Sequence, residues 1–249
     1  MMRQRFAQAA SSYDQFATIQ ELSAELISNV ELTHYPTRIL DIGCGTGYLT
    51  QKMANKYPQS TIDAVDASAS MIKQFMGRNL RNTRPICASY NDFLASYQYD
   101  LIVSNAALHW MNISQSFLNI SLQLAKKGVA IFTMFGRGTS PELRQLLPVI
   151  HRPNWVVSDA FMTEEEITDC GQSHFKSWCI TRHKQMQRFD SVMDMLTTQK
   201  KTGVNAKQYS EGLWTPRQLK TLEDAFMMHY GQVQLSYEMF LCIGHNEDG

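Results

Sequence analysis

The sequence lacks an excess of charge of either sign and any apolar run long enough to cross a membrane. Its 23 basic and 23 acidic residues cancel to a formal net charge of +0, which argues against a chain-wide cationic surface for nucleic acid. The longest apolar stretches, such as 129–135, are far shorter than the roughly 20 residues that span a bilayer. We therefore expect neither nucleic acid nor a membrane as a partner.

Paired cysteines and disorder-promoting residues are also scarce. The 5 cysteines contain no Cys-x-x-Cys pair, so neither a disulfide framework nor a metal site is predicted. With 44% hydrophobic residues, 13 Gly and 7 Pro, the composition excludes a disordered or fibrous chain. Residues 1–15 have no apolar segment typical of a secretory signal. These absences predict a globular cytoplasmic protein with reduced thiols.

Strand and helix patterns alternate between residues 38 and 135. Short apolar strands are expected at 38–42, 61–66, 86–88, 99–104 and 129–133. Helical spacing is found between them, at 48–57, 68–80 and 114–125. Near-continuous apolar strands alternating with helices are typical of a parallel sheet covered on both faces. Right-handed crossovers then predict an α/β fold with a doubly wound, mostly parallel sheet.

The flanks of this region have different patterns. An amphipathic helix is expected at 14–30, another helix at 141–149, and irregular chain at 155–174. Strands are expected at 175–189 and 232–245, the latter as an antiparallel edge, with helices at 190–201 and 215–229. Without repeats or a low-complexity linker, we expect one domain over 1–249. Its expected parts are an N-terminal helical lid (1–30), a cofactor-binding core (38–135), a substrate-side insertion (136–230) and a closing strand (232–245).

A glycine-rich turn, Asp41-Ile42-Gly43-Cys44-Gly45-Thr46-Gly47, follows the first expected strand and opens a helix. Glycines let the backbone turn sharply and approach a ligand at a helix N-terminus. The Gly-x-Gly-x-Gly spacing differs from the Gly-x-Gly-x-x-Gly of dinucleotide sites. Asp41 would repel a pyrophosphate, but it suits the ammonium and sulfonium of S-adenosylmethionine. Asp66 ends the second strand, where a carboxylate accepts hydrogen bonds from ribose hydroxyls, so the turn predicts S-adenosylmethionine binding.

This region resembles the class I S-adenosylmethionine-dependent methyltransferases, and segments on both sides of it resemble one family among them. These segments are Phe6-Ala7-Gln8-Ala9-Ala10-Ser11-Ser12-Tyr13 with Gln20, Ser104-Asn105-Ala106-Ala107-Leu108-His109-Trp110, 135–143, and Leu235-Ser236-Tyr237-Glu238-Met239-Phe240. They are similar to the malonyl-acyl-carrier-protein O-methyltransferases of biotin synthesis. The resemblance departs at Ser89, where the family usually has an acid that contacts the adenine amino group.

The resemblance implies a Rossmann-like, seven-stranded sheet, S-adenosylmethionine as methyl donor and S-adenosylhomocysteine as product. Together with the glycine-rich turn, it implies a set of cofactor-binding residues: Tyr13, Gln20, Asp41, Gly43, Cys44, Gly45, Thr46, Gly47, Asp66, Ala67, Met71, Ser89, Tyr90, Asn105 and Ala106. It further implies esterification of the free carboxylate of a malonyl thioester. The implied partner is acyl carrier protein or coenzyme A.

Methyl transfer to a carboxylate needs no general base, because a carboxyl group with a pKa of about 4 is already ionised at pH 7. No catalytic residue is therefore expected, and proximity and desolvation would accelerate the reaction. Substrate-binding candidates are Tyr13, His109, Trp110, Arg137 and Arg144. We favour Arg144 as the partner of the substrate carboxylate, since it would lie on a helix over the crevice, although a surface arginine is the simpler interpretation for either one.

Three alternatives stay open at this stage. The chain could methylate another small carboxylate or hydroxyl compound, or bind the cofactor without catalysis and regulate a partner. A loose basic cluster, Lys200, Lys201 and Lys207, is either a solvated face or a docking surface for an acidic carrier protein.

Overall fold

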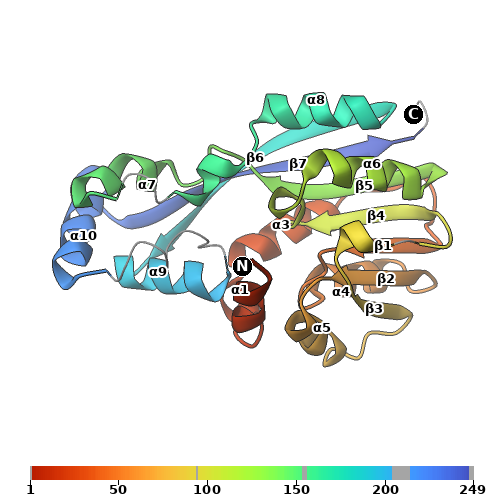
Figure 1. The fold of residues 1–249 in the computed structure, drawn as a ribbon, viewed down its shortest axis with the longest axis horizontal. Coiled ribbons are helices and arrows are strands. Elements are labelled where there is room, and N and C mark those ends of the chain that lie inside the picture. Colours follow the sequence, from red (N-terminus) through yellow and green to blue (C-terminus); the bar gives the residue numbers. More distant parts are fainter. Residues whose placement is uncertain (1, 94, 153–155, 204–213, 247–249) are drawn as a thin grey trace.

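The computed structural model describes residues 2–93, 95–152, 156–203 and 214–246 (Figure 1). One seven-stranded sheet has the order β3-β2-β1-β4-β5-β7-β6. Its strands are β1 (Arg38–Ile42), β2 (Thr61–Asp66), β3 (Thr83–Cys87), β4 (Tyr99–Asn105), β5 (Leu124–Phe135), β6 (Ser177–Phe189) and β7 (Val233–His245). The helices are α1 (Met2–Ala9), α2 (Tyr13–Phe16), α3 (Thr18–Ser28), α4 (Tyr48–Lys56), α5 (Ala69–Met76), α6 (Ile113–Gln123), α7 (Pro141–Leu146), α8 (Glu164–His174), α9 (Val192–Lys201) and α10 (Pro216–Tyr230). Short 3-10 turns are η1 (Tyr90–Asp92), η2 (Leu108–Trp110), η3 (Leu147–Ile150) and η4 (Val157–Ala160).

The strand directions match the expected fold class. Neighbouring strands from β3 to β5 pair in parallel, whereas β7 pairs antiparallel with both β5 and β6. Only β7 therefore runs against the others. The prediction of an α/β, mostly parallel seven-stranded sheet with an antiparallel last strand is confirmed.

Successive residues of the central strands alternate between two apolar layers, as the period of a strand requires. On one face, Leu40 packs in a cluster that includes Phe117 of α6 and Ile167 of α8. On the other face, Ile39 packs in a cluster that includes Ile27 of α3 and Met53 of α4. The last residues of β2 and β4, Asp66 and Asn105, are not part of these layers, and the loops at this edge of the sheet are free to form a site.

Strands β6 and β7 form a long hairpin that extends past the rest of the sheet. β7 pairs with β6 from Val233 to His245, but with β5 only from Met239 onward. Figure 1 shows α7, α9 and α10 gathered around the projecting end. A third apolar cluster fills the space around this projecting end and includes Leu143 of α7, Met195 of α9 and Phe226 of α10. The part of the segment expected at 136–230 that carries α7, α9 and α10 thus has its own apolar core, whereas α8 packs against the central sheet.

The region expected to be irregular, 155–174, contains the helix α8, and that prediction is wrong. Thr163 and Glu166 form a reciprocal capping box at its start, which satisfies otherwise unpaired backbone N–H groups. Gly171 lies under Trp178, and a Cβ at this glycine would come within 2.2 Å of the indole ring. The glycine and many polar residues hide this helix from an apolar periodicity.

Other boundaries also differ from expectation, and the fifth strand, for example, begins at Leu124 rather than at residue 129. The single helix at 14–30 is instead two helices, α2 and α3, separated at Ala17. The helix expected to reach 149 changes to a 3-10 turn at Leu147, where Pro148 has no N–H to continue the α-helical pattern. The third strand begins at Thr83 rather than at residue 86, because it pairs with β2 through a stretch that is not apolar.

Candidate functional site

The glycine-rich turn has a backbone that only glycine adopts without strain. Gly43 and Gly47 have φ values of +69° and +89°, in the left-handed region that L side chains rarely occupy. A Cβ at Gly43 would lie 2.4 Å from Cβ of Ala107, and one at Gly47 would lie 2.5 Å from the Phe75 ring. The turn therefore packs closely against the β4–α6 connection on one side and α5 on the other.

Asp66 lies at the end of β2, directly beside this turn. Its Oδ2 accepts a hydrogen bond of 3.0 Å from the backbone N–H of Gly45, and its Oδ1 accepts one of 2.7 Å from the N–H of Ser68. The carboxylate is thus held in place at the mouth of a crevice.

Two adjoining hollows surround the turn. The outer crevice, about 500 Å³, runs from the glycine turn past Asp66 to the residues that follow β3 and β4. The inner hollow, about 50 Å³, lies between the turn and helices α2 and α3. Tyr13, Gly43, Gly45 and Asn105 line both of them, so one elongated ligand can occupy the two together.

The sequence-predicted cofactor residues gather in these two hollows. The outer crevice contains Tyr13, Gly43, Gly45, Asp66, Ala67, Met71, Ser89, Tyr90, Asn105 and Ala106. The inner hollow contains Tyr13, Gln20, Asp41, Gly43, Cys44, Gly45, Thr46 and Asn105. Gly47 lines neither hollow, and its role is to give the turn its left-handed backbone conformation. What these residues bind stays a prediction.

Asp41 is the buried carboxylate of the inner hollow, with 1% of its surface exposed. Oδ2 accepts a hydrogen bond of 2.5 Å from Oγ1 of Thr50, but Oδ1 has no partner among the described residues. Burial raises the pKa of Asp41 to about 7, the Thr50 hydrogen bond opposes this shift, and the charge of Asp66 adds to it. A buried oxygen without a protein partner is a place for a donor from a ligand or an ordered water.

Helices α2 and α3 close the inner hollow and are tied to the core. Asn105 at the end of β4 donates from Nδ2 to the backbone oxygen of Gln20 at 2.8 Å and accepts from Oγ of Ser23. Thr46 donates to Asp14 at 2.6 Å. The N-terminal segment therefore forms one wall of the site, as the expectation of a lid requires, whereas its motion stays a prediction.

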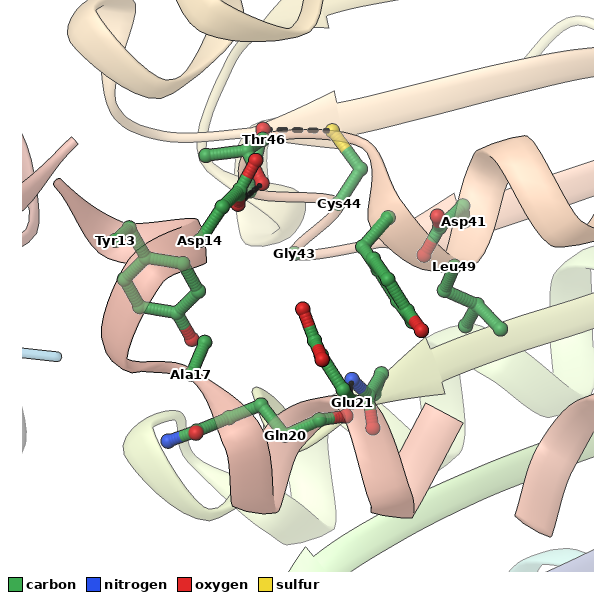
Figure 2. A pocket seen from close by; sticks show the side chains of 13 residues that line it. Tyr13, Asp14, Ala17, Gln20, Glu21, Asp41, Gly43, Cys44, Thr46 and Leu49 are labelled. Atoms are coloured by element: carbon green, nitrogen blue, oxygen red, sulfur yellow. Dashed lines mark hydrogen bonds between the residues drawn. The ribbon is translucent and has the colours of Figure 1, made fainter. Parts of the chain in front are cut away.

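Sequence reasoning missed two acids on α2 and α3, Asp14 and Glu21, that line the inner hollow. Figure 2 shows the Glu21 carboxylate directed into the space in front of the glycine turn, while the Gln20 amide leaves α3 in another direction. Sequence reasoning also missed Asp92, which lines the outer crevice three residues after Ser89. The sequence signal for Asp92 is its place within a few residues of the third strand.

Aromatic side chains form the far wall of the outer crevice. Trp110 lines the crevice and packs edge-on against Phe6 and Phe161. His109 packs against Trp110 but lines a different hollow, next to α6 and α8. Burial lowers the pKa of His109 to about 3, so its ring is neutral at physiological pH. The structure therefore does not bring the His109 ring into the cofactor crevice.

The expectation that Arg144 lies over the crevice is wrong. Arg144 and Arg137 line a separate open hollow together with Arg182, beside the projecting β6–β7 hairpin. Arg144 is paired with Asp159 at 2.8 Å, and Arg137 with Glu166 at 3.2 Å. The helix carrying Arg144 follows that hairpin away from the glycine turn (Figure 1), which apolar periodicity alone did not indicate.

Two other kinds of site are absent from the described part of the chain. Within 2–93, 95–152, 156–203 and 214–246, no group of His, Cys, Asp and Glu side chains is arranged to hold a metal ion. None of the helices described there combines the length and apolar character needed to cross a membrane. Lys207 of the basic cluster lies outside the described residues.

Known proteins resemble this chain in sequence and in structure. Residues 39–128 match the family described as a methyltransferase domain. Malonyl-[acyl-carrier protein] O-methyltransferase 2 of Ilyobacter polytropus is 30% identical over 233 residues, which cover 92% of this chain and 90% of that protein. Malonyl-[acyl-carrier protein] O-methyltransferase of Priestia megaterium is 29% identical over 262 residues, covering 97% and 95%.

Solved structures share the fold at low identity. The YcgJ protein from Bacillus subtilis matches with a TM-score of 0.64 and 15% identity, over 92% of this chain and 99% of that one. The plantazolicin methyltransferase BpumL, solved with S-adenosylhomocysteine and a substrate analogue, matches with a TM-score of 0.56 and 16% identity, over 98% and 97%. From its sequence relatives, the chain belongs to the malonyl-[acyl-carrier protein] O-methyltransferase family and is a class I methyltransferase.

Proposed function

We propose that this protein transfers the methyl group of S-adenosylmethionine to the free carboxylate of a malonyl group carried by acyl carrier protein. The observation that carries the proposal is the 30% identity to a malonyl-[acyl-carrier protein] O-methyltransferase over 90% of that relative. Such a reaction hides a charge at the end of a short acyl chain. It suits an early step of biotin synthesis, in which chain-elongating enzymes accept an uncharged group.

The residues of the two hollows fit S-adenosylmethionine, the methyl donor. Asp66 lines the outer crevice at the end of β2, where its carboxylate is the proposed partner of the ribose hydroxyls, and the same crevice offers apolar walls and Ser89 for an adenine ring. The unpartnered Oδ1 of Asp41 lies in the inner hollow, where the amino-acid end would reach. A cofactor that carries a sulfonium is also attracted by the carboxylates of the site.

The bound cofactor supplies an electrophilic methyl group. One carboxylate oxygen of the substrate forms the new O–CH₃ bond while the C–S⁺ bond breaks, and the electron pair of that bond stays on sulfur as a neutral thioether. This chain's residues hold the two reactants in line and keep water away, which are the main contributions available to a displacement without proton transfer. Neutral, buried His109 is not needed as a base.

For the substrate carboxylate, Tyr13 and Trp110 are the sequence candidates that reach the cofactor crevice, with His109 behind Trp110. The guanidinium of Arg144 is half-exposed and already paired with Asp159. We propose that it meets an incoming carboxylate by exchanging this partner, with Arg137 beside it. Because the carboxylate is methylated in the cofactor crevice, Arg144 would hold it only on entry, before the acyl chain passes from the open hollow into that crevice.

The carrier is proposed to be acyl carrier protein, with malonyl-coenzyme A as the smaller alternative. Lys200 and Lys201 at the end of α9 are candidates for contacting the acidic surface of the carrier protein. The whole chain is proposed to work as one domain, with residues 1–30 as the lid.

Methyl transfer from labelled S-adenosylmethionine tests the proposal. Malonyl-loaded carrier protein should accept the label, whereas acetyl-loaded carrier protein, which lacks the free carboxylate, should not. Label on free small acids but not on malonyl carriers would replace the proposal with a small-molecule carboxyl methyltransferase. Cofactor binding without transfer to any of these acceptors would favour a non-catalytic regulator.

A further inference from the structure

One further hollow, among α3, α9 and the β6–β7 hairpin, is lined by no charged side chain of the described chain, and we call it the neutral hollow. It measures about 30 Å³, which is space for about two water-sized groups. Phe135 and Phe161 give it an apolar part. Gln20, Gln187 and Tyr237 give it amide and hydroxyl groups. Such a lining suits a small polar group without charge.

The neutral hollow adjoins both the open arginine hollow and the cofactor site. Gly138 lines the open hollow, and Thr139, the next residue, lines the neutral hollow. Gln20 lines the neutral hollow and also the inner hollow at the glycine turn. Phe135 packs in one cluster with Trp110, which lines the outer crevice. An acyl chain that passes from the open hollow to the cofactor can therefore leave one of its groups in the neutral hollow.

Two side chains of this hollow have a donor to offer. The hydroxyl of Tyr237 donates to Oε1 of Gln187 at 3.4 Å, which is long for a bond between two oxygens. Burial and the charge of Glu142 raise the pKa of Tyr237, so this hydroxyl keeps its proton. The side-chain amide of Gln20 is directed away from the Glu21 carboxylate (Figure 2) and makes no hydrogen bond with any residue that the structure describes. An acceptor that enters the hollow thus meets neutral donors.

Glu142 of α7 adds a negative charge near Tyr237. It is 2% exposed, and its oxygens accept hydrogen bonds from the backbone N–H and the hydroxyl of Ser236. Moving another anion into an uncharged space close to this carboxylate is unfavourable. A carbonyl oxygen, in contrast, needs only a neutral donor. The neutral hollow therefore favours a carbonyl group over a carboxylate.

We propose that the neutral hollow binds the thioester carbonyl of the malonyl group, with the Tyr237 hydroxyl as donor to its oxygen. This inference rests on the proposed function, since it assumes a malonyl thioester as acceptor. One methylene joins this carbonyl to the carboxylate, so fixing the carbonyl also positions the carboxylate oxygen that forms the O–CH₃ bond. Tyr237 keeps its proton throughout. It determines specificity, because free malonate would bring a second charge to the hollow.

Two small molecules with the same malonyl carbon chain give the sharpest test. Monomethyl malonate has a neutral ester carbonyl at one end, whereas malonate is charged at both ends at neutral pH. Their inhibition constants against methyl transfer to malonyl-loaded carrier protein are measured for wild type, Tyr237→Phe and Tyr230→Phe. Tyr230→Phe is the matched control, because it also removes a hydroxyl near Glu142, but one that donates to Gln145 outside the neutral hollow.

Wild type should bind monomethyl malonate at least about tenfold more tightly than malonate, since only malonate places a charge in the hollow. Tyr237→Phe should raise both the inhibition constant of monomethyl malonate and KM for the malonyl carrier about three- to tenfold, the value of a neutral hydrogen bond. The dissociation constant of S-adenosylhomocysteine, measured by calorimetry, and the inhibition constant of malonate should stay within about twofold. Tyr230→Phe should change none of these constants.

Equal inhibition of wild type by the two molecules would overturn the inference. So would an unchanged inhibition constant of monomethyl malonate in Tyr237→Phe, or a loss that extends to cofactor affinity or appears equally in Tyr230→Phe, because the hydroxyl would then have only a structural role. If wild-type protein does not methylate the malonyl carrier at all, the proposed function is wrong, which is a separate failure.

Discussion

The backbone N–H of Gly45 donates a hydrogen bond of 3.0 Å to Oδ2 of Asp66. This bond joins the glycine turn after β1 to the carboxylate that ends β2. The loop and the ribose-facing acid therefore form one unit before any ligand arrives. Preorganisation of this kind lowers the cost of ordering groups when the ligand binds.

Asp66→Asn should weaken binding of S-adenosylmethionine by about 1.5–3 kcal/mol, because a charged acceptor is replaced by an amide that accepts through one oxygen. Calorimetry measures the change. Asp92→Asn is the comparison variant, since it removes a negative charge from the same crevice. Equal effects of the two substitutions would mean that only the net charge of the crevice matters.

Asp41 gives the ligand-free protein a predictable pH dependence. Burial raises the folded-state pKa of Asp41 to about 7 from its ordinary value of 3.8, so between these pH values the folded state holds more protons than the unfolded state. Stability contributed at this group therefore falls as pH rises from about 4 to about 7. Asp41→Asn removes this slope, so its melting temperature relative to wild type should rise between pH 5 and pH 8.

Thermal unfolding of both proteins across this pH range measures the difference in melting temperature. Both proteins carry the same neighbouring ionisable groups, which are Asp14, Glu21, Cys44 and Asp66. A constant difference between the two melting temperatures would show that Asp41 does not titrate there.

Gly47→Ala should lower the free energy of unfolding by about 2–4 kcal/mol, from a left-handed backbone plus a collision with Phe75. Gly45→Ala should cost only about 1–2 kcal/mol, because its φ is also positive but a Cβ there meets nothing within 4 Å. Urea denaturation compares the two variants. Equal losses would indicate that α5 moves to accept the added methyl group.

Substitutions of Arg144 and Asp159 should change KM for the substrate in opposite directions if Arg144 exchanges Asp159 for the substrate carboxylate. Arg144→Ala should raise KM for malonyl-loaded carrier protein about tenfold, about 1.4 kcal/mol, while cofactor affinity stays unchanged. Asp159→Asn frees the guanidinium and should lower KM. If neither variant changes KM, this half-exposed pair only stabilises the segment around α7.

Residues 6–29 should exchange amide hydrogens more slowly when S-adenosylmethionine is bound. Tyr13 and Gln20 line the hollows around the glycine turn, so a ligand there adds contacts to α2 and α3. Lids that exclude water are common in enzymes of this kind. Hydrogen exchange with and without cofactor measures the protection, and equal rates would leave these helices as fixed scaffold.

The features that sequence predicted well are local ones. A strand, a glycine-rich turn and an acid at the next strand end are separated by few residues, and parallel pairing of β1 with β2 brings Asp66 to the turn without further information. The helix expected at 68–80 likewise begins directly after Ser68, whose hydroxyl accepts from the N–H of Met71.

What the sequence did not predict depends on long-range packing. The position of Arg144 follows from the register of the β6–β7 hairpin, which projects past β5. Glu21 faces the glycine turn because α3 docks on β4 through Asn105. No local pattern distinguishes it from Glu25, which points at Lys52 instead.

Intact-mass analysis of carrier protein tests the central claim most directly. Malonyl-loaded acyl carrier protein is incubated with the enzyme and S-adenosylmethionine, and the thioester-bound group is then released and identified. The account predicts a gain of one methyl group, recovered as the methyl ester of the malonyl carboxylate, in wild type and at a strongly reduced rate in Asp66→Asn. An unmodified malonyl group after incubation with cofactor-binding wild-type enzyme would contradict it.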